Sequence, residues 1–499
     1  MRKPIQTLLI LITGIITGFG FYHGAVDVHE KYTKDFFFYV MEEVSFGYEI
    51  VSVKMSPIVK NVEGKFASAK NILQEELKEV SLVEEDDKLV IRDSLVKYQL
   101  QGKIRDYLTI NTVSVPDKGK SAVVDLDDMS IYLYEDGEEI KKMPIKSKGR
   151  PGSPWETPAG EYEIQYKNES HFSSIGEVYM PYSMQFFGNF FIHGWPYYAD
   201  GTLVEEGYSG GCIRIDDEYI EDVYDFVGVG TKVIIVGGEE LIKDGEYIDK
   251  GIGLSRMTSE SYLVADLLSG EVILEKKARE IYPIASLSKL MTAIVSLEGV
   301  NQFIDTKISR RAIDAYGYQG GLEYGEDIVV GDLIYPLLLE SSNDAAEAIS
   351  EVNGRNYFMR LMNQKSKAIG LLNTSFDDPS GLSPDNLSTA EDLFRLTQYI
   401  YKNKRYIFDV TMIPFRDHEN HTWYSNSRFI KDDRYIGSKN GYTDEARKTL
   451  IVNYNLNFDG VERPVSIILL YGTDSSSDVK TILNYLSRNI EYLDVEVVS

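Results

Sequence analysis

The sequence predicts a multidomain protein with three main parts: an N-terminal membrane anchor, a β-rich domain and an α+β domain. Length is the first observation, because 499 residues correspond to about three domains at roughly 150 residues each. The second is an uncharged segment near the N-terminus, and the third is a change in the spacing of apolar residues along the chain. A hydrophobic content of 43% and a charged content of 26% are typical of globular chains, so we expect these parts to fold.

Residues 1–26 are predicted to form a transmembrane signal anchor. Arg2 and Lys3 precede an uncharged stretch from Pro4 to Val26, which is long enough to cross a bilayer. Positive charge before this stretch and Asp27 after it favour a cytoplasmic N-terminus, with the rest of the chain exported. A cleaved signal peptide is the alternative, and it leads to the same compartment.

Residues 27–118 contain no chemical motif and are predicted to be a stalk or a small spacer domain. One amphipathic helix is expected there, because apolar residues recur at spacings of three and four: Phe66, Ala69, Leu73, Leu77 and Val80.

Residues 119–237 are predicted to form the β-rich domain. Ala122–Leu126 and Ile131–Tyr134 have the composition of strands, and Asp136-Gly137 supplies a turn after the second. Residues 238–256 are rich in glycine and charge, which predicts a linker.

Residues 257–499 are predicted to form the α+β domain. Strands are expected at 262–267 and 272–275, helices follow residue 284, and strands return at 449–454 and 465–471. A closing helix with Asp478 as its N-cap is expected after the last strand. A sheet built from both ends of a segment around a central helical block is an α+β architecture.

Composition excludes several classes of function. Lys and Arg total 52 and Asp and Glu total 78, and the resulting net charge of −26 repels phosphate backbones, so no nucleic-acid partner is expected. The single cysteine, Cys212, rules out an intramolecular disulfide, and the six histidines show no metal-ligand spacing. No metal or cofactor is therefore predicted, and Cys212 is either a buried packing residue or a chemical group.

The surroundings of Cys212 favour chemistry. Gly210 and Gly211 precede it, so the backbone can turn tightly and bring amide groups close to a developing oxyanion. If the segment is extended, Cys212 and Arg214 share one face. A thiol needs a base or a positive charge to become a nucleophile, and His193 is the candidate base.

This part of the chain resembles the L,D-transpeptidase family of peptidoglycan cross-linking enzymes. The similar motifs are Thr157–Tyr162, Met180–Tyr182, Ile192–Gly194 and Gly211–Arg214. The resemblance implies a β-sandwich-like catalytic domain in which Cys212 accepts the acyl group and His193 is its base. It implies that the Gly194 carbonyl orients the imidazole, and that Ser209, Gly211 and Arg214 bind substrate. Gly210 stands where the family usually has histidine.

A second candidate nucleophile lies in the α+β domain. Ser286 and Lys289 are three residues apart at the start of an apolar-periodic segment, so a helix would place both side chains on one face. Lysine acts as a base only when it is neutral. The helix N-terminus and a nearby second lysine are expected to lower the pKa of Lys289.

Two later motifs strengthen this assignment. Ser341-Ser342-Asn343 and the segment Lys439–Glu445 follow the Ser286 motif in an order and spacing that resemble the penicillin-binding serine D,D-peptidases. The segment Phe376–Leu382 is typical of low-molecular-weight D-alanyl-D-alanine carboxypeptidases. Class A β-lactamases share the S-x-x-K scaffold, but no motif for their deacylating glutamate is apparent, so the peptidase is favoured.

The resemblance implies a role for each motif residue. Ser286 is the nucleophile, Lys289 its base and Ser341 a proton relay. The residues implied to bind substrate are Asn343, Lys439, Asn440, Gly441 and Thr443, and the strand of Lys439 receives the terminal carboxylate. Asn440 stands where the family has threonine, and Arg447 where it often has glycine.

Together these features predict a bifunctional peptidoglycan-modifying enzyme of the cell envelope, anchored in the cytoplasmic membrane with its catalytic domains outside the cytoplasm. The expected partners are peptidoglycan stem peptides and covalently bound β-lactam inhibitors. The serine site would make the tetrapeptide stems that the thiol site uses, and a flexible tether would raise their local concentration. The alternatives are a wall-binding scaffold with one or both sites decayed, as the departures at Gly210, Asn440 and Arg447 suggest, or a D,D-endopeptidase at the serine site.

Overall fold

The computed structural model describes residues 115–237, 245–251, 253–317 and 319–494, and two short strands before them. By its contacts the chain divides into Met1–Asp117 and Lys118–Ser499. In the first unit, β1 (Leu82–Glu85) and β2 (Lys88–Ile91) pair antiparallel. The predicted anchor and almost all of the predicted spacer lie outside the described residues. Among the helices that are described, none combines the length and the apolar character needed to cross a bilayer.

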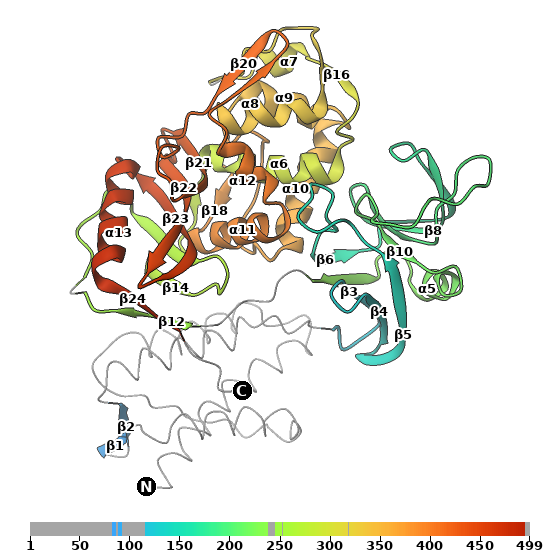
Figure 1. Ribbon diagram of the computed structural model, residues 1–499, viewed down its shortest axis with the longest axis horizontal. Coiled ribbons are helices and arrows are strands. Elements are labelled where there is room, and N and C mark those ends of the chain that lie inside the picture. The colour runs from blue at the N-terminus through green and yellow to red at the C-terminus, as the bar shows by residue number, and fades with distance from the viewer. Residues whose placement is uncertain are drawn as a thin grey trace. The chain divides into compact units, whose positions relative to one another are not determined.

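The first part of the second unit, called here the thiol domain, is built on a nine-stranded sheet (Figure 1). The strand order is β6-β11-β3-β4-β5-β10-β9-β8-β7. The strands are β3 (Lys120–Asp125), β4 (Ser130–Glu135), β5 (Glu138–Ser147), β6 (Gly160–Glu163), β7 (Tyr166–Ser173), β8 (Val178–Phe187), β9 (Phe190–His193), β10 (Ile213–Ile215) and β11 (Lys232–Val236), with one helix, α5 (Ile220–Phe226).

The predicted strands of this domain are confirmed, and so is the turn between β4 and β5. Asp136 and Gly137 both adopt positive φ, at 50° and 81°, as a tight hairpin with right-handed twist requires. Burial alternates along β10, where Ile213 and Ile215 are buried and Arg214 is half-buried. β10 runs parallel to β9 with Arg214 opposite His193, so strand pairing brings the cysteine and histidine segments together.

The second part, the serine domain, has a five-stranded antiparallel sheet with the order β14-β13-β23-β22-β21. Its strands are β13 (Ser261–Asp266), β14 (Val272–Lys276), β21 (Tyr435–Thr443), β22 (Arg447–Phe458) and β23 (Val461–Gly472). Both ends of the segment thus build one sheet, as predicted.

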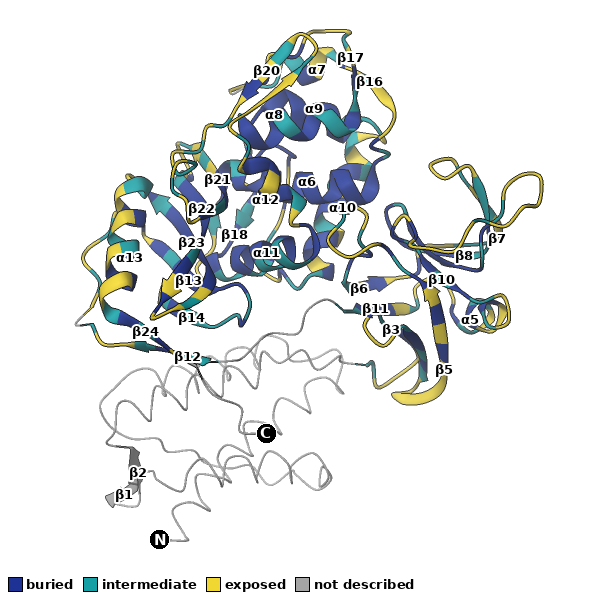
Figure 2. Cartoon of the chain, in the orientation of Figure 1, coloured by how far each residue is buried: buried dark blue, intermediate teal, exposed yellow. Residues whose placement is uncertain are grey.

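Some helices of this domain lie against the sheet, and the others form a helical part beside it (Figure 1). The helices are η2 (Ala285–Leu287), α6 (Ser288–Gly299), α7 (Arg310–Ile313), η3 (Val330–Leu333), α8 (Ile334–Leu339), α9 (Asn343–Glu351), α10 (Arg355–Ala368), α11 (Ala390–Asn403), α12 (Tyr406–Thr411) and α13 (Ser475–Asn489). Two-stranded pairs complete the domain: β15 (Tyr282–Pro283) with β18 (Leu387–Ser388), β16 (Asp305–Lys307) with β17 (Asp327–Val329), and β19 (Phe415–His418) with β20 (His421–Tyr424). The helix α6 is buried along its whole length (Figure 2), because other elements cover it on all sides.

Two details differ from the sequence analysis. Residues within the predicted linker form β12 (Gly245–Asp249), which pairs antiparallel with β24 (Ile490–Asp494). The prediction of Asp478 as the cap of the closing helix is wrong, because Asp474 accepts the capping hydrogen bond from the Ser477 N–H. The carboxylate of Asp478 is buried instead, where it accepts hydrogen bonds from Thr258 and Ser259.

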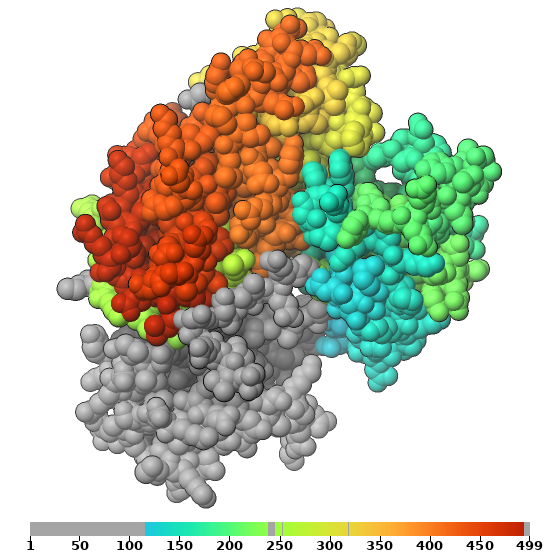
Figure 3. Space-filling model, in the orientation of Figure 1, coloured from blue at the N-terminus to red at the C-terminus, as the bar shows by residue number. Residues whose placement is uncertain are grey.

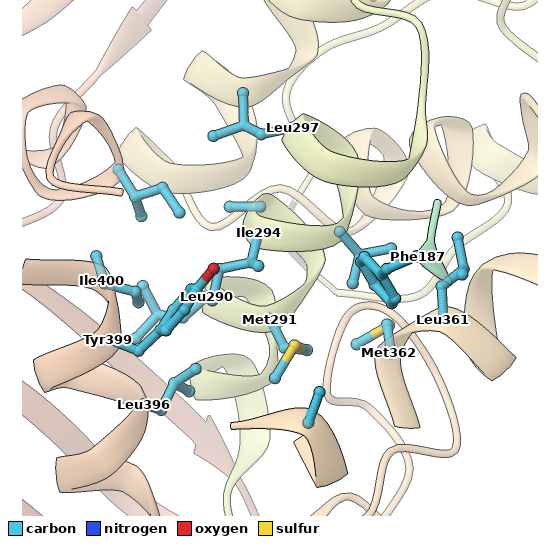
Figure 4. Packing of buried hydrophobic residues seen from close by; sticks show 14 of the residues in the cluster. Phe187, Leu290, Met291, Ile294, Leu297, Leu361, Met362, Leu396, Tyr399 and Ile400 are labelled. Atoms are coloured by element: carbon cyan, nitrogen blue, oxygen red, sulfur yellow. The ribbon is translucent and has the colours of Figure 1, made fainter. Parts of the chain in front are cut away.

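The thiol domain and the serine domain share one hydrophobic core. Phe187, at the end of β8, is fully buried and belongs to the same cluster as Leu361 and Met362 of α10. Figure 4 shows the Phe187 ring beside these two side chains, and Figure 3 shows the cyan segment of the thiol domain lying directly against the orange helical part of the serine domain. The two domains are therefore packed together, which differs from the flexible tether that the sequence suggested.

Candidate functional site

The serine site is built where η2 leads into α6. Ser286 lies in η2 and Lys289 in the first turn of α6, so the predicted helical spacing is confirmed. The residue before the serine, Ala285, has a strained φ of 49°. Gly381 lies directly against this turn, because a Cβ there would be only 1.9 Å from the Ala285 carbonyl oxygen. Only glycine fits so close to the backbone that carries Ser286.

The ammonium group of Lys289 makes three hydrogen bonds. Its Nζ lies 2.9 Å from Ser286 Oγ, 2.7 Å from Asn343 Oδ1 and 2.5 Å from the Ser380 carbonyl oxygen. Burial lowers the pKa of Lys289 to about 7, against the opposing charges of Asp378 and Asp344. The predicted direction is thus confirmed, but desolvation is the main cause, where the sequence analysis named the helix N-terminus and a second lysine.

A second lysine completes the polar cluster. Lys439 Nζ donates to Ser341 Oγ at 2.7 Å and to the carbonyl of its neighbour Asn440 at 2.8 Å. Burial, and then the charge of Lys289, hold the pKa of Lys439 well below its usual value. Ser341 itself has a positive φ of 63°, a conformation that places its side chain between α8 and α9. Burial therefore lowers the pKa of both lysines of this cluster.

The strand β21 passes directly beside the nucleophile. A Cβ at Gly441 would lie 2.8 Å from the Ser286 main-chain nitrogen. Asn440 is exposed on the same strand. Thr443 has a structural partner, because its Oγ1 accepts a hydrogen bond of 3.0 Å from the Ala446 N–H at the β21–β22 turn. Gly441 is therefore in contact range of the nucleophile, and Thr443 holds the turn beyond it.

The remaining predicted residue of this site, Asn343, links three elements. Its Oδ1 accepts from Lys289, and its Nδ2 donates to the Tyr316 carbonyl at 2.6 Å. The sequence analysis did not assign a role to Ser380, whose carbonyl also accepts from Lys289. Asp378 fixes that loop by accepting hydrogen bonds from the main chain of Ser380 and Gly381. The sequence analysis named the Phe376–Leu382 motif as typical of the family, but it did not predict which atom of this loop contacts Lys289.

The thiol site is a pocket lined by Cys212, His193, Arg214, Ser209 and Gly210, among others. The thiol of Cys212 donates toward the Asn189 carbonyl at 3.8 Å. Burial raises the pKa of Cys212 to about 11, although Arg214 acts in the opposite direction. The resting thiol is therefore protonated at neutral pH.

His193 is held in one tautomer. Its Nδ1 lies 2.6 Å from the Gly194 carbonyl oxygen. A carbonyl only accepts, so Nδ1 carries the proton and Nε2 keeps its lone pair. Burial lowers the pKa of His193 to about 4, which leaves the imidazole neutral at pH 7. A neutral imidazole with an unprotonated Nε2 has the form that a general base requires.

The loop before Cys212 is braced by its own side chains. Ser209 Oγ donates to the Cys212 carbonyl at 2.5 Å and accepts from the Gly211 N–H at 3.1 Å. Gly211 has a φ of 107°, and its carbonyl accepts from Thr157 Oγ1 at 2.9 Å. Gly210 faces open space, because a Cβ there would meet no atom within 4 Å. Ser209 and Gly211 therefore shape the loop, and the predicted substrate contact of Gly211 has no support in its buried position.

Part of the thiol pocket comes from the serine domain, which the sequence analysis missed. The residues are Leu297, Glu298, Val300, Asn301, Gln302 and Phe303, at the end of α6 and just beyond it. No sequence signal could have indicated this, because these residues lie outside both motifs and reach the pocket only through domain packing.

The folds and sites define a two-centre protein, with a hydrogen-bonded serine–lysine pair in an α+β domain and a pocket lined by cysteine and histidine in a β domain. Residues 250–459 match the family model described as D-alanyl-D-alanine carboxypeptidase, and residues 119–235 match the L,D-transpeptidase catalytic domain.

Curated relatives match less than half of this chain. The D-alanyl-D-alanine endopeptidase of Pseudomonas aeruginosa is 30% identical over 227 residues, which cover 43% of this chain and 71% of that protein. The D-alanyl-D-alanine endopeptidase of Escherichia coli is 29% identical over 237 residues, with the same coverage of 43% and 71%. The carboxypeptidase DacA of Escherichia coli is 29% identical over 241 residues, covering 44% of this chain and 57% of that protein.

A solved D-alanyl-D-alanine carboxypeptidase from Mycobacterium tuberculosis superposes with a TM-score of 0.44 at 24% identity, covering 48% of this chain and 94% of that one. The chain belongs to the D-alanyl-D-alanine carboxypeptidase family and carries an L,D-transpeptidase catalytic domain in front of its peptidase domain.

Proposed function

We propose that this protein is a bifunctional peptidoglycan-modifying enzyme. The serine site removes the terminal D-alanine from pentapeptide stems, and the thiol site uses the resulting tetrapeptide stem as an acyl donor. The hydrogen bond of 2.9 Å between Lys289 and Ser286 carries the proposal, because the pKa of Lys289 near 7 makes its neutral form available as a base.

At the serine site, neutral Lys289 takes the proton from Ser286 Oγ, which attacks the carbonyl of the penultimate residue. The C–N bond to the terminal D-alanine breaks, and the proton that Lys289 took from Ser286 passes to the leaving amine through Ser341, which is hydrogen-bonded to Lys439. Water then hydrolyses the serine ester and restores the hydroxyl. Asn343, Lys439, Asn440 and Gly441 are the groups that we propose for binding the stem.

At the thiol site, Nε2 of His193 takes the proton of the Cys212 thiol as it attacks the carbonyl of stem residue three. The C–N bond to residue four breaks, and the protonated imidazole gives its proton to the departing amine of D-alanine. An amine of a second stem then attacks the thioester, forms the new amide and releases the thiol. Arg214, at the same pocket, is proposed to hold an oxygen of the donor.

The two sites lie toward opposite ends of α6. Ser286 and Lys289 are at its N-terminal end and the thiol pocket includes its C-terminal end. The 12 residues of this helix span about 18 Å at 1.5 Å per residue. A tetrapeptide made at one site must therefore leave it before it reaches the other.

The test is digestion of purified muropeptides by the wild-type chain, Ser286→Ala and Cys212→Ala, with products read by mass spectrometry. We expect Ser286→Ala to stop removal of the fifth residue and to lose labelling by fluorescent penicillin. Cys212→Ala should stop release of the fourth residue alone. A wild-type chain that neither binds penicillin nor changes muropeptides would contradict the proposal and favour a wall-binding scaffold.

A D,D-endopeptidase at the serine site is the second candidate. The observation in its favour is that the relatives from Pseudomonas aeruginosa and Escherichia coli are named D-alanyl-D-alanine endopeptidases. Cross-linked muropeptide dimers distinguish the two activities. An endopeptidase converts them to monomers through Ser286, whereas a carboxypeptidase leaves the cross-link intact.

We propose that the protein acts in the cell envelope, with residues 1–26 as its membrane anchor and both catalytic domains outside the cytoplasm. Its proposed partners are stem peptides and covalently bound β-lactams. Fractionation of cells that produce the full chain tests this location, since we expect the protein in the membrane fraction and sensitive to protease added from outside.

A further inference from the structure

The thiol pocket has one wall from the serine domain. Residues 297–303 are called here the α6 exit segment, and all of them except Gly299 line the pocket together with Cys212 and His193. The exit segment also reaches the rim of the thiol domain, where the Phe303 ring stacks on Trp155 with centroids 5.7 Å apart. Both side chains are exposed, Trp155 to 40% and Phe303 to 65%, so this contact forms part of the outer surface of the site.

The exit segment is held firmly against the thiol domain. The Glu298 carbonyl accepts a hydrogen bond of 3.1 Å from the Asn189 N–H, and a Cβ at Gly188 would lie 2.6 Å from that same oxygen. The Glu298 carboxylate is fully buried and lies 2.8 Å from Lys365 Nζ. Lys404, which is also buried, donates to the Glu156 carbonyl of the thiol domain at 2.7 Å. These contacts fix the position of Gln302, which follows in the same segment.

Gln302 lines the pocket and carries a buried hydrogen-bond acceptor without a partner among the described residues. Its side chain is only 8% exposed. Its Nε2 donates to the carbonyls of Ser296 at 2.6 Å and Val300 at 3.1 Å, and these two acceptors decide which side of the amide is nitrogen. Its Oε1 is buried and has no hydrogen-bond partner within the part of the chain that the structure describes. Buried acceptors almost always have a hydrogen-bond donor, so the donor that Oε1 lacks is expected from a ligand.

A matching donor lies in the same pocket on the thiol domain. The Nε of Arg214 is buried and is likewise without a partner among the described residues. Gln302 Oε1 accepts from an N–H group, and Arg214 Nε donates to an oxygen. A peptide unit presents both of these groups, and so does an amino-acid terminus with an amine and a carboxylate.

We propose that Gln302 is a substrate-binding residue of the thiol site, which accepts a hydrogen bond from an N–H group of the stem peptide while Arg214 holds an oxygen of the same ligand. This inference rests on the proposed acyl transfer at Cys212. It makes the serine domain a physical part of the thiol site. The N–H group belongs either to the acyl donor or to the amine that accepts the acyl group.

The test compares Gln302→Met with Gln319→Met in the full-length chain. Gln319 is a matched control, because its Nε2 also donates to two main-chain carbonyls, at 2.8 and 3.2 Å, but its side chain is exposed and it does not line the thiol pocket. If Gln302 contacts the acyl donor, Gln302→Met should lower kcat/KM for D-alanine release from a tetrapeptide stem about tenfold, the effect of one lost hydrogen bond. Penicillin labelling of Ser286 should stay unchanged, which shows that the variant is folded.

A binding measurement separates the inference from the activity. Calorimetric titration of a tetrapeptide stem into Cys212→Ala, with and without Gln302→Met, should show about tenfold weaker binding in the double variant if Gln302 contacts the donor. If it contacts the acceptor, binding and hydrolysis stay unchanged, and only exchange of the released residue for an added D-amino acid slows.

Equal values for the Gln302 and Gln319 variants in all three assays would overturn the inference and leave the proposed function intact. A wild-type chain that does not act on the tetrapeptide, together with a Cys212→Ala chain that does not bind it, would overturn the proposed thiol activity, and the inference with it.

Discussion

The main-chain N–H of Asn189 donates a hydrogen bond of 3.1 Å to the carbonyl of Glu298. Asn189 also accepts, through its own carbonyl, the weak hydrogen bond from the Cys212 thiol. Glu298 lies in the last turn of α6, and the first turn of the same helix carries Lys289. The buried helix α6 therefore connects the two candidate sites. The buried charges around Glu298, which hold this helix in place, contribute to the packing of both domains.

Neutralising Glu298 should destabilise the protein. Its carboxylate lies 2.8 Å from Lys365 Nζ and 3.7 Å from Lys404 Nζ, and all three side chains are fully buried. Glu298→Gln leaves two buried amines without their counter-charge, at a cost of about 3 kcal/mol in the free energy of unfolding at pH 7. Urea denaturation measures this cost.

The loss of unfolding free energy caused by Glu298→Gln should become smaller as the pH rises toward 10. Burial already lowers the pKa of Lys365 to about 8, so the folded state loses the lysine proton before the unfolded state does, and stability rises with pH in that window. The control is Asp327→Asn, which removes an exposed ion pair with Lys307 and should cost less than about 1 kcal/mol. Equal costs at the two sites would contradict the role of Glu298.

Acylation of Ser286 should depend on pH through Lys289. Because burial lowers the pKa of Lys289 to about 7, the neutral amine that acts as base is scarce at pH 5 and predominates at pH 9. The rate of labelling by fluorescent penicillin should therefore rise with pH and level off above about 7.

Lys289→Arg should remove that profile and slow acylation by roughly 100-fold or more, because a guanidinium does not give up its proton. A wild-type rate that stays flat from pH 5 to 9 would show that Lys289 is not the base.

Alkylation of Cys212 should be slow at neutral pH in the resting enzyme. Burial raises the pKa of this thiol to about 11, and only the thiolate reacts with iodoacetamide. The alkylation rate should rise about tenfold for each pH unit between 7 and 10, whereas an ordinary thiol with a pKa of about 8.5 levels off near pH 9. Mass spectrometry of the intact chain measures the alkylation rate. An alkylation rate that reaches a plateau below pH 9 would indicate a thiolate that is stabilised before substrate binds.

Neighbouring glycines in the nucleophile loop should respond in opposite ways to substitution. Gly210→His should change the free energy of unfolding by no more than about 0.5 kcal/mol, because its Cβ meets no atom within 4 Å and its φ is not positive. Gly211→Ala should cost about 2–3 kcal/mol, because its φ is 107° and the new Cβ would lie 2.1 Å from the Phe190 ring. Thermal unfolding of both variants measures the difference, and comparable losses would contradict this account of the loop.

Contacts within one segment were predictable from the sequence. Ser286 and Lys289 meet because helical geometry brings residues three apart onto one face. Ile213 and Ile215 are buried while Arg214 reaches the pocket, because side chains alternate along a strand.

Contacts between distant segments needed the folded chain. Lys439 reaches Ser341 across 98 positions, and Gln302 reaches the pocket of Cys212 from another domain. The family resemblance grouped Lys439 with Ser341, but no resemblance pointed to Gln302, because the contact belongs to the pairing of two families in one chain.

The amino-acid sequence by itself determined which residues are candidates for the chemistry and which face of its own element each one occupies, because helical and extended periodicity are local properties of the backbone. The tertiary structure alone decided that burial, more than a helix terminus, lowers the pKa of Lys289, and that α6 joins the two sites. Desolvation and domain packing depend on every segment that covers a residue, and those segments are remote in sequence.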